Sequence, residues 1–268
     1  MTGQHIPIAT LIASKPKNPD LLRRALISVI QQYRRPDLLL LAFDRRLPEP
    51  GALDGVISNP FINGVVVLRN ERMQGAAGTW NTGLSWLQEQ GFDGYVAILD
   101  DDDEWDPDHL SQCERAGARG GADVVLSGLR VMKDGVEIPR APLSSVTVDD
   151  FLAGNPGWQG SNTFVKLEAL MRVGGFTDGL PSTNDRDLAV RLLGLPDLKV
   201  AFTHRMTATW HIDSQADALS RPGSPEKRAG LLQFLAMHGH LMSPDVMTSS
   251  RRVPVICLAL TCHERERA

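Results

Sequence analysis

Residues 97–108 read AILDDDDEWDPD, in which an apolar run leads directly into four consecutive aspartates. The segment 95–99 has the composition of a buried strand, so the carboxylates follow the end of that strand. Adjacent carboxylates repel each other, and a folded chain tolerates such a cluster only where open solvent or a bound cation offsets the charge. Two interpretations follow. The cluster is either an acidic helix start in solvent, since Asp106 and Asp108 precede a helix-like segment, or a site for Mg²⁺ or Mn²⁺.

The composition limits the class of protein. The chain has 268 residues, of which 42% are hydrophobic and 22% charged, and this suits one large α/β domain. A net charge of −4 argues against nucleic acid as a partner, because such proteins carry a basic face. No apolar run approaches the roughly 18 residues of a membrane span, and the N-terminus lacks the pattern of a secretory signal. Cys113, Cys257 and Cys262 are too few for a disulfide framework, and Cys257, Cys262 and His263 offer too few ligands for a metal site. We therefore expect a cytoplasmic protein without a transmembrane segment.

Strand-like and helix-like segments alternate through the first half of the chain. A β-α-β-α-β order implies a mostly parallel sheet with right-handed crossovers, and ligands bind such sheets beyond the carboxyl ends of the strands. Ser14, Asp44 and Asp100 each stand at the end of a predicted strand, so we expect them to meet at one edge of the sheet. The predicted strands are 6–13, 37–43, 64–68 and 95–99. One predicted helix begins at Asn18, and a second spans 79–90.

The second half is less regular. The glycine-rich segment 157–162 has the composition of a binding loop. We find no linker, so we expect a single domain at 1–213 and a C-terminal tail or lid at 214–268 that closes the same domain. The expected helices are 107–118, 147–153, 167–173 and 185–193, and the expected strands are 122–132, 136–138 and 206–210.

Five segments follow one another in an order that resembles family 2 glycosyltransferases of the GT-A fold. They are IPIATLIASKPKNPDLLRRALISVIQQ, LLLLAFDRR, VVVLRNERMQGAAGTWNTGL, YVAILDDDDEWDPDHL and VGGFTDGL with NDRDLAVRLL, and LDDDDEWDPDHL is the most specific. The resemblance covers residues 6–221. It implies a Rossmann-like, mostly parallel sheet flanked by helices. It also implies an inverting enzyme that moves a sugar from a nucleotide-diphosphate sugar, with a UDP-sugar expected first, to an unidentified hydroxyl or amine acceptor.

The resemblance also implies a donor site. Asp100 and Asp102 take the positions of the family's DxD motif, with Asp102 as the ligand of Mn²⁺ or Mg²⁺, while Asp103 binds the ion through water or holds the site together. His211 is a second implied metal ligand and His204 is its rival. The implied nucleotide and donor contacts are Ala13, Ser14, Asp44, Arg69, Asn81, Asp100, Asp101, Asp102, Ser220 and Arg221.

This sequence departs from the family pattern at three places on the donor side. The family's aromatic residue after the first strand is missing from 13–16, Asp44 stands alone where the family has an acidic pair, and Trp80 replaces a small or basic residue. Asp44 is also compatible with a simple turn.

On the acceptor side, the resemblance implies that Asp185 is the base that deprotonates the acceptor. Asn184 replaces the glutamate that precedes this residue in the family, and Asp185 is also compatible with a helix cap. Asp187 and Arg191 have the spacing of a helical salt bridge. The implied acceptor or sugar pocket comprises Trp158, Gln159, Ser161 and Asn184, although Trp158 is equally suited to the core.

Two other functions fit the same residues. A nucleotidyltransferase of the same fold carries a glycine-rich basic loop after the first strand, and residues 14–17 have the lysines of such a loop without its glycines. A non-catalytic nucleotide- or carbohydrate-binding module would explain the missing aromatic and Asn184. Near the C-terminus, the apolar segment 253–260 fits either a packed strand or a peripheral contact with a membrane or partner.

Overall fold

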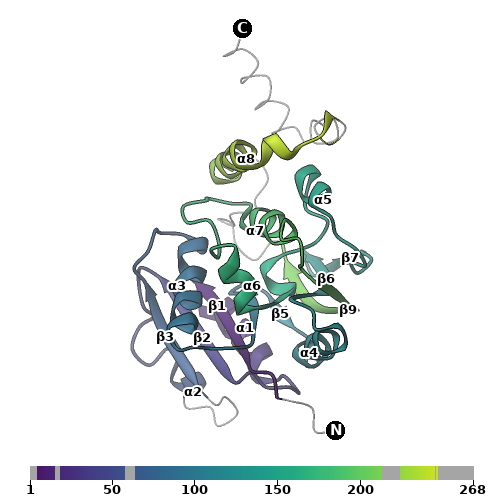
Figure 1. The fold of residues 1–268 in the computed structure, drawn as a ribbon. Coiled ribbons are helices and arrows are strands. Elements are labelled where there is room, and N and C mark those ends of the chain that lie inside the picture. The colour runs from purple at the N-terminus through teal and green to yellow at the C-terminus, as the bar shows by residue number, and fades with distance from the viewer. Residues whose placement is uncertain (1–4, 16–18, 58–63, 213–223, 245, 247–268) are drawn as a thin grey trace.

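The structure is a computed structural model that describes residues 5–15, 19–57, 64–212, 224–244 and 246. These residues form an α/β fold in which helices pack on both faces of one mixed sheet (Figure 1). The strand order is β3-β2-β1-β4-β8-β6-β9-β5, and β7 pairs with β6 at one side. The expected α/β class is therefore confirmed.

The first four long strands form the parallel part of the sheet. They are β1 (Ile8–Ser14), β2 (Leu38–Asp44), β3 (Val65–Asn70) and β4 (Tyr95–Asp100). β1 lies between β2 and β4 and is parallel to both, while β3 is parallel to β2. Each strand matches a predicted apolar run to within two residues, because strands that are buried on both faces form continuous hydrophobic stretches.

The remaining strands extend the sheet with mixed directions. β8 (Thr163–Lys166) runs antiparallel to β4 and to β6 (Val124–Lys133), and β6 pairs in parallel with β9 (Val200–His211). β5 (Glu104–Trp105) and β7 (Val136–Ile138) are short additions. The sequence predicted neither β5 nor β8, since two to four residues are too few to show an alternation, and it placed the start of β9 six residues too late.

The helices agree with the sequence pattern in type and differ mainly at their ends. The predicted ones are α1 (Pro19–Ile30), α3 (Ala76–Glu89), α4 (His109–Gly120), α5 (Val148–Ala153), α6 (Leu167–Arg172) and α7 (Asn184–Leu193). The sequence did not predict α2 (Asp54–Ile57), α8 (Pro225–His238) or the two 3₁₀ turns Gly160–Asn162 and Gly239–Leu241.

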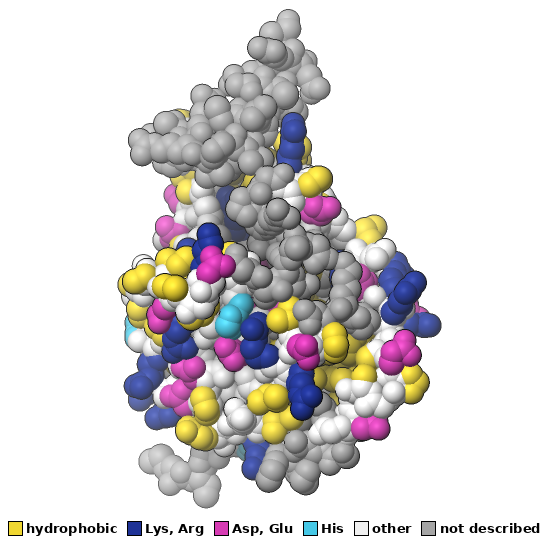
Figure 2. All heavy atoms as spheres, turned by 180° about the vertical axis from the view of Figure 1, so that it is seen from behind, with side chains coloured by type: hydrophobic (Ala, Val, Ile, Leu, Met, Phe, Trp, Pro, Cys, Tyr) yellow, Lys and Arg dark blue, Asp and Glu magenta, His cyan; other side chains and the backbone are white. Residues whose placement is uncertain are grey.

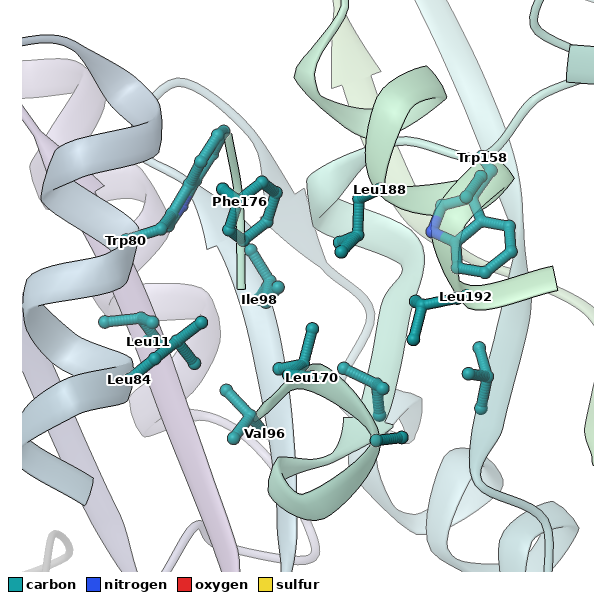
Figure 3. Close-up of a cluster of buried hydrophobic side chains, with 14 of the residues drawn as sticks. Leu11, Trp80, Leu84, Val96, Ile98, Trp158, Leu170, Phe176, Leu188 and Leu192 are labelled. Carbon is teal, nitrogen blue, oxygen red and sulfur yellow. The ribbon is translucent and has the colours of Figure 1, made fainter. Parts of the chain in front are cut away.

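Two apolar cores lie on the two faces of the sheet because successive strand residues point in opposite directions. On one face, Leu11 and Ile98 pack with residues of α3, α6 and α7 (Figure 3). On the other face, Ile12 and Leu99 pack with residues of α1 and α4. This packing fixes the carboxyl ends of β1, β2 and β4 relative to one another, and the candidate site lies at these ends.

α8 lies in the segment that was expected to be a tail. Its first turn is capped by the Ser224 hydroxyl, which accepts a hydrogen bond from the Lys227 amide, and Pro225 occupies the first helical position. Phe234 is fully buried in the same core as α7, next to which α8 lies in Figure 1. The apolar residues of α8 do not form one clean stripe, since Leu232 is exposed, and the helix was missed for this reason.

The surface carries charges of both signs. On the face seen in Figure 2, basic and acidic side chains are interspersed with apolar ones. Within the described ranges, no helix is long and apolar enough to cross a bilayer. The segment 253–260, for which a packed strand or a peripheral membrane contact was expected, lies outside the described residues.

Candidate active site

A cavity of about 390 Å³ lies beyond the carboxyl ends of β1, β2 and β4. Ser14, Asp44 and Asp100 line it, so the predicted meeting of these three strand ends is confirmed. Other segments also line the walls, among them the start of α3, the turn before β8, and the N-terminal ends of α7 and α8. The sequence-predicted residues that line the cavity are Ala13, Ser14, Asp44, Asp100, Asp101, Asp102, Gln159, Asn184 and Asp185.

The four aspartates have different surroundings. Asp101 accepts a hydrogen bond of 2.6 Å from the Ser14 hydroxyl, and burial raises its pKa to about 6. Burial, and then the charges of Asp103 and Asp185, raise the pKa of Asp100 well above its usual value. Asp102 lines the cavity, and its backbone carbonyl accepts a hydrogen bond from the Arg24 guanidinium.

Asp103 is fully buried and supports the site from behind. It accepts hydrogen bonds from the Ser161 hydroxyl at 2.5 Å and from the His211 backbone amide at 3.1 Å. Burial and the nearby Asp102 raise the pKa of Asp103, so these two bonds only partly offset its isolation from water. Ser161 also accepts a hydrogen bond from the Asp100 backbone amide at 3.1 Å, which ties β4 to the turn before β8.

A hard divalent cation fits this end of the cavity only together with a ligand. Among the residues that the structure describes, no three His, Cys, Asp or Glu side chains gather closely enough to hold an ion. Mg²⁺ and related ions commonly use one or two carboxylates and take their other oxygens from water and substrate phosphates. The carboxylates of Asp100 and Asp102 are suitable donors, and a cation would also offset the repulsion that raises the pKa of Asp100.

The two histidine candidates lie outside the set of residues that line the cavity. His211 follows Trp210, which does line it, and the His211 ring Nε2 is 2.9 Å from the Glu104 carboxylate. His204 lies in a separate surface hollow with Asp106 and Arg130. A role for His211 in metal binding stays a prediction.

Asp44 provides an unfilled acceptor in the cavity wall. Its Oδ1 accepts hydrogen bonds from the Asn70 side-chain amide at 3.0 Å and from the Gly75 backbone amide at 3.3 Å. Its Oδ2 is buried and has no hydrogen-bond partner within the described part of the chain. Buried carboxylate oxygens are normally paired, so this oxygen is suited to an N–H or O–H group of a ligand.

Trp80, which departs from the family pattern, lines the same wall. Its indole stacks on Phe176 with a centroid separation of 4.5 Å, and Figure 3 shows the two rings together between α3 and the rest of the core. This contact gives the wall a flat apolar surface at the start of α3.

Two expected nucleotide contacts are corrected by the structure. The Arg69 side chain is 57% exposed and forms a surface ion pair with Glu71 at 2.8 Å, so it does not line the cavity. Asn81 is buried and bonds to both backbone groups of Phe176 and to Asp178, each at 2.8 Å. Asn81 therefore holds the loop after α6 against α3 and leaves no group for a nucleotide.

Two expected pocket residues are also corrected. Trp158 is 1% exposed and packs edge-to-face on Phe151, and its indole nitrogen donates a hydrogen bond to Thr163 at 2.7 Å. Figure 3 shows Trp158 within the buried cluster near Leu192, so it is a core residue. Ser161 is fully buried and acts on the site only through Asp100 and Asp103.

Asp185 lies at the start of α7 on the opposite wall. Burial raises its pKa to about 7, and the nearby Lys227 charge and a hydrogen bond from the Gly160 backbone amide limit the rise. A β-carbon at position 160 would lie 2.9 Å from the Asp100 carboxylate, so only glycine lets the backbone approach both acids. Thr183 occupies the N-cap position, so Asp185 is not the cap of this helix.

The expected salt bridge between Asp187 and Arg191 is confirmed at 2.6 Å. Asp187 also accepts hydrogen bonds from Thr177 at 2.7 Å and from the His238 ring of α8 at 2.8 Å. Burial alone would raise the pKa of Asp187, but the bonds from His238 and Arg191 outweigh it and lower the pKa. Asp187 thus joins α7, α8 and the preceding loop.

Comparison with known proteins identifies the family. Residues 17–147 match the family described as "Glycosyl transferase family 2". The chain belongs to glycosyl transferase family 2. The amylovoran biosynthesis glycosyltransferase AmsB of Erwinia amylovora is 27% identical over 237 residues, which cover 81% of this chain and 73% of AmsB. The succinoglycan biosynthesis protein ExoW of Rhizobium meliloti (strain 1021) is 35% identical over 118 residues, 43% of this chain, and the match spans only about a third of ExoW, 35%.

Solved structures share the fold of this family 2 glycosyltransferase. Residues 1–349 of S. aureus TarS, in complex with UDP-GlcNAc, align with a TM-score of 0.67 at 13% identity and cover 92% of this chain and 71% of that one. The mannosyltransferase PcManGT from Pyrobaculum calidifontis, in complex with GDP-Man and Mn²⁺, aligns with a TM-score of 0.63 at 15% identity. That alignment covers 98% of this chain and 76% of PcManGT. The likeness establishes the GT-A fold.

Several residues of this glycosyltransferase line the cavity without having been predicted. Lys227 belongs to the unpredicted helix α8, and none of the others was assigned a contact with a ligand from its sequence pattern. They belong to segments far apart in the sequence, so only the three-dimensional structure shows that they line one cavity. They are Asn155, Arg140, Arg186, Trp210 and Lys227, together with Trp80. The predicted contacts Ser220 and Arg221 lie outside the described residues.

Proposed function

We propose that this family 2 glycosyltransferase transfers a sugar from a nucleoside-diphosphate sugar to an acceptor hydroxyl with inversion of configuration. One observation carries the proposal. A single cavity joins the aspartates at the end of β4 to Asp185, a partly buried carboxylate with a pKa of about 7. The first group suits a cation and a diphosphate, and the second suits a general base.

The nucleotide would occupy the wall formed by the ends of β1 and β2 and the start of α3. Asp44 offers its unfilled oxygen to an N–H group of the base, and Ala13 and Trp80 supply apolar surface beside it. A UDP-sugar is the donor to test first, since TarS was solved with UDP-GlcNAc. PcManGT was solved with GDP-Man, so GDP-sugars belong in the same test.

Asp102, with Asp100 beside it, would hold Mn²⁺ or Mg²⁺ against the diphosphate of the donor. PcManGT was solved with Mn²⁺ as well as GDP-Man, which supports a divalent ion in this fold. When bound, the ion would act as a Lewis acid that stabilises the charge of the departing diphosphate. Asp103, Ser161 and the His211 amide would hold the loop after β4 in place.

Asp185 would act on the acceptor. Its carboxylate accepts the proton of the acceptor hydroxyl while the hydroxyl oxygen forms a bond to the anomeric carbon of the donor sugar. The bond from that carbon to the diphosphate oxygen breaks, and the nucleoside diphosphate leaves with the electron pair. Attack on the face opposite the leaving group inverts the anomeric configuration. A base whose pKa is close to neutral pH is well matched to this proton transfer.

The test is a transfer assay with Asp185→Asn. The enzyme is incubated with UDP-glucose, UDP-galactose, UDP-GlcNAc or GDP-mannose, a panel of p-nitrophenyl glycosides and Mn²⁺, and released nucleotide and glycosylated product are measured. We expect turnover with one donor, a rate about 10²–10⁴-fold lower in Asp185→Asn, and unchanged nucleotide binding in that variant. A non-catalytic binding module would bind the nucleotide without any turnover in the wild type. Equal rates in the two proteins would contradict the role of Asp185.

A further inference from the structure

One face of α8 carries a lysine among packed residues. Lys227, Gly230, Phe234 and His238 follow a spacing of three and four residues and so share this face. Phe234 is fully buried, Gly230 and His238 are nearly so, and Lys227 lines the cavity. A lysine on the inward face of a helix is unusual, because burial penalises its charge.

The contacts of this face fix α8 in position. A β-carbon at Gly230 would lie 2.3 Å from the Ser182 hydroxyl and under 3.0 Å from the Ser182 backbone. α8 therefore packs directly on Ser182, which immediately precedes the N-cap residue of α7. The Arg186 guanidinium stacks over the Phe234 ring at 4.3 Å, and His238 bonds to Asp187. α8 therefore holds Lys227 over the start of α7, where Asp185 lies.

Within the described part of the chain, nothing bonds to the ammonium of Lys227. It forms no hydrogen bond or salt bridge with any described residue, Asp185 included, although the two groups act on each other electrostatically. Burial and the positive charge of Arg186 lower the pKa of Lys227, and the single carboxylate of Asp185 raises it only in part. The guanidinium of Arg186 already bonds to the Phe151 and Leu152 carbonyls, so Lys227 is the cation at this wall that an anion bound in the cavity would pair with.

A second unfilled group lines the same cavity. The Asn184 side chain is 6% exposed and lines the cavity, and its Oδ1 is buried without a hydrogen-bond partner in the described ranges. An amide oxygen of this kind accepts a hydrogen bond from a hydroxyl group. The wall next to Asp185 therefore offers one cation and one hydroxyl acceptor, a combination that suits a sugar with an acidic group.

We propose that Lys227 binds a carboxylate or phosphate group of the acceptor, so that the acceptor of this enzyme is an anionic sugar. This assignment rests on the proposed function, because it takes Asp185 as the base that faces the acceptor. The diphosphate of the donor is the other possible source of the negative charge. We assign the anion to the acceptor because Lys227 lies on α8 over the start of α7, where Asp185 is, whereas the proposed site of the donor diphosphate is at Asp102, at the end of β4.

The experiment measures binding of three matched sugars to the full chain by titration calorimetry with saturating UDP or GDP and Mg²⁺. The probes are methyl β-D-glucoside, methyl β-D-glucuronide and methyl β-D-glucoside 6-phosphate, which differ only at carbon 6. We expect at least one anionic probe to bind about tenfold more tightly than the neutral one. We also expect this preference to vanish in Lys227→Met and to persist in Lys227→Arg. Arg228→Met is the matched control, because it removes an exposed charge from the next position of the same helix.

Each outcome decides between the assignments. Failure of both anionic probes to bind more tightly than the neutral one, or a preference that survives Lys227→Met, overturns the proposal. If Lys227→Met instead weakens UDP or GDP binding about tenfold and leaves the sugars unaffected, the anion is the diphosphate of the donor and the acceptor assignment is wrong. Nucleotide titrations of the wild type separate this inference from the proposed function, which fails if neither nucleotide binds, whatever the sugars do.

Discussion

At the scale of single residues, the four consecutive aspartates are divided among different tasks. Asp101 bonds to Ser14, Asp102 and Asp100 face the cavity, and Asp103 is buried behind them on Ser161 and the His211 amide. The cluster is therefore neither a fully solvated acidic segment nor a set of four metal ligands. The like charges are tolerated because burial shifts some of them toward the protonated form.

The pH dependence of Asp185 gives a test at this scale. Because its pKa in the folded protein is about 7, we expect kcat/KM to rise as the pH increases through about 7 and to level off above it. The folded pKa is raised above the unfolded value of about 3.9, so ionisation of Asp185 destabilises the fold as the pH rises through this interval. Asp185→Asn should therefore raise the melting temperature more at pH 8 than at pH 4.5, although it slows turnover. An identical difference at both pH values would contradict a raised pKa.

The chemical type of each residue predicted part of the site correctly. It failed for residues whose side chains are buried in the core. The strand-end acids were found because parallel strands bring their carboxyl ends to one edge. Trp158 and Asn81 were assigned to ligand contacts because an aromatic and an amide suit sugars and nucleotides. The structure instead gives their polar groups internal partners, Thr163 for the tryptophan and Phe176 for the asparagine. A single sequence contains no signal for such partners, since they are 5 and 95 positions away along the chain.

At the scale of elements, long buried strands and well-capped helices were predictable, and short or late elements were not. β1 to β4 are continuous apolar runs. β8 has four residues and gains its stability from pairing with both β4 and β6, which no local pattern reveals. α8 lacks a clean apolar stripe and is held mainly by particular contacts to α7.

The junction of α7 and α8 gives a prediction at this scale. Asp187→Asn removes a buried charge that bonds to Thr177, Arg191 and His238, so we expect the free energy of unfolding to fall by about 3 kcal/mol in urea titrations at pH 7. The folded pKa of Asp187 is lowered, so its contribution is present above the unfolded pKa of about 3.9 and is lost as the pH falls below it. The difference between variant and wild type should therefore shrink toward pH 3.

A matched control for this junction is Asp197→Asn. Asp197 pairs with Arg172 in an ion pair on the surface, so its substitution should leave the unfolding curve unchanged. Equal stability of Asp187→Asn and Asp197→Asn at pH 7 would contradict the claim that the contacts of Asp187 hold α8 on the domain.

At the scale of the whole molecule, the residues proposed for the donor and those proposed for the acceptor lie on different parts of the fold. The segment that matches the family, 17–147, includes β2, β3 and β4 and therefore Asp44 and the aspartate cluster. Asp185 and Lys227 lie beyond it, on α7 and α8. The resemblance implied the strand-end aspartates and also Asp185, whereas Lys227 lies on a helix that the sequence did not predict and required the structure.

Thermal unfolding with nucleotides is the most direct test of the central claim that the cavity binds a nucleoside diphosphate together with a divalent ion. The chain is heated with UDP, GDP, dTDP or CDP, each with and without Mn²⁺, and Asp102→Asn is compared with the exposed control Asp93→Asn. A nucleotide present at 100 times its Kd should raise the midpoint by about 5 °C or more, since only the folded chain binds it. We predict such a rise for one nucleotide, with Mn²⁺ only, in the wild type and in Asp93→Asn but not in Asp102→Asn. No rise with any nucleotide, or the same rise in Asp102→Asn, would contradict the account.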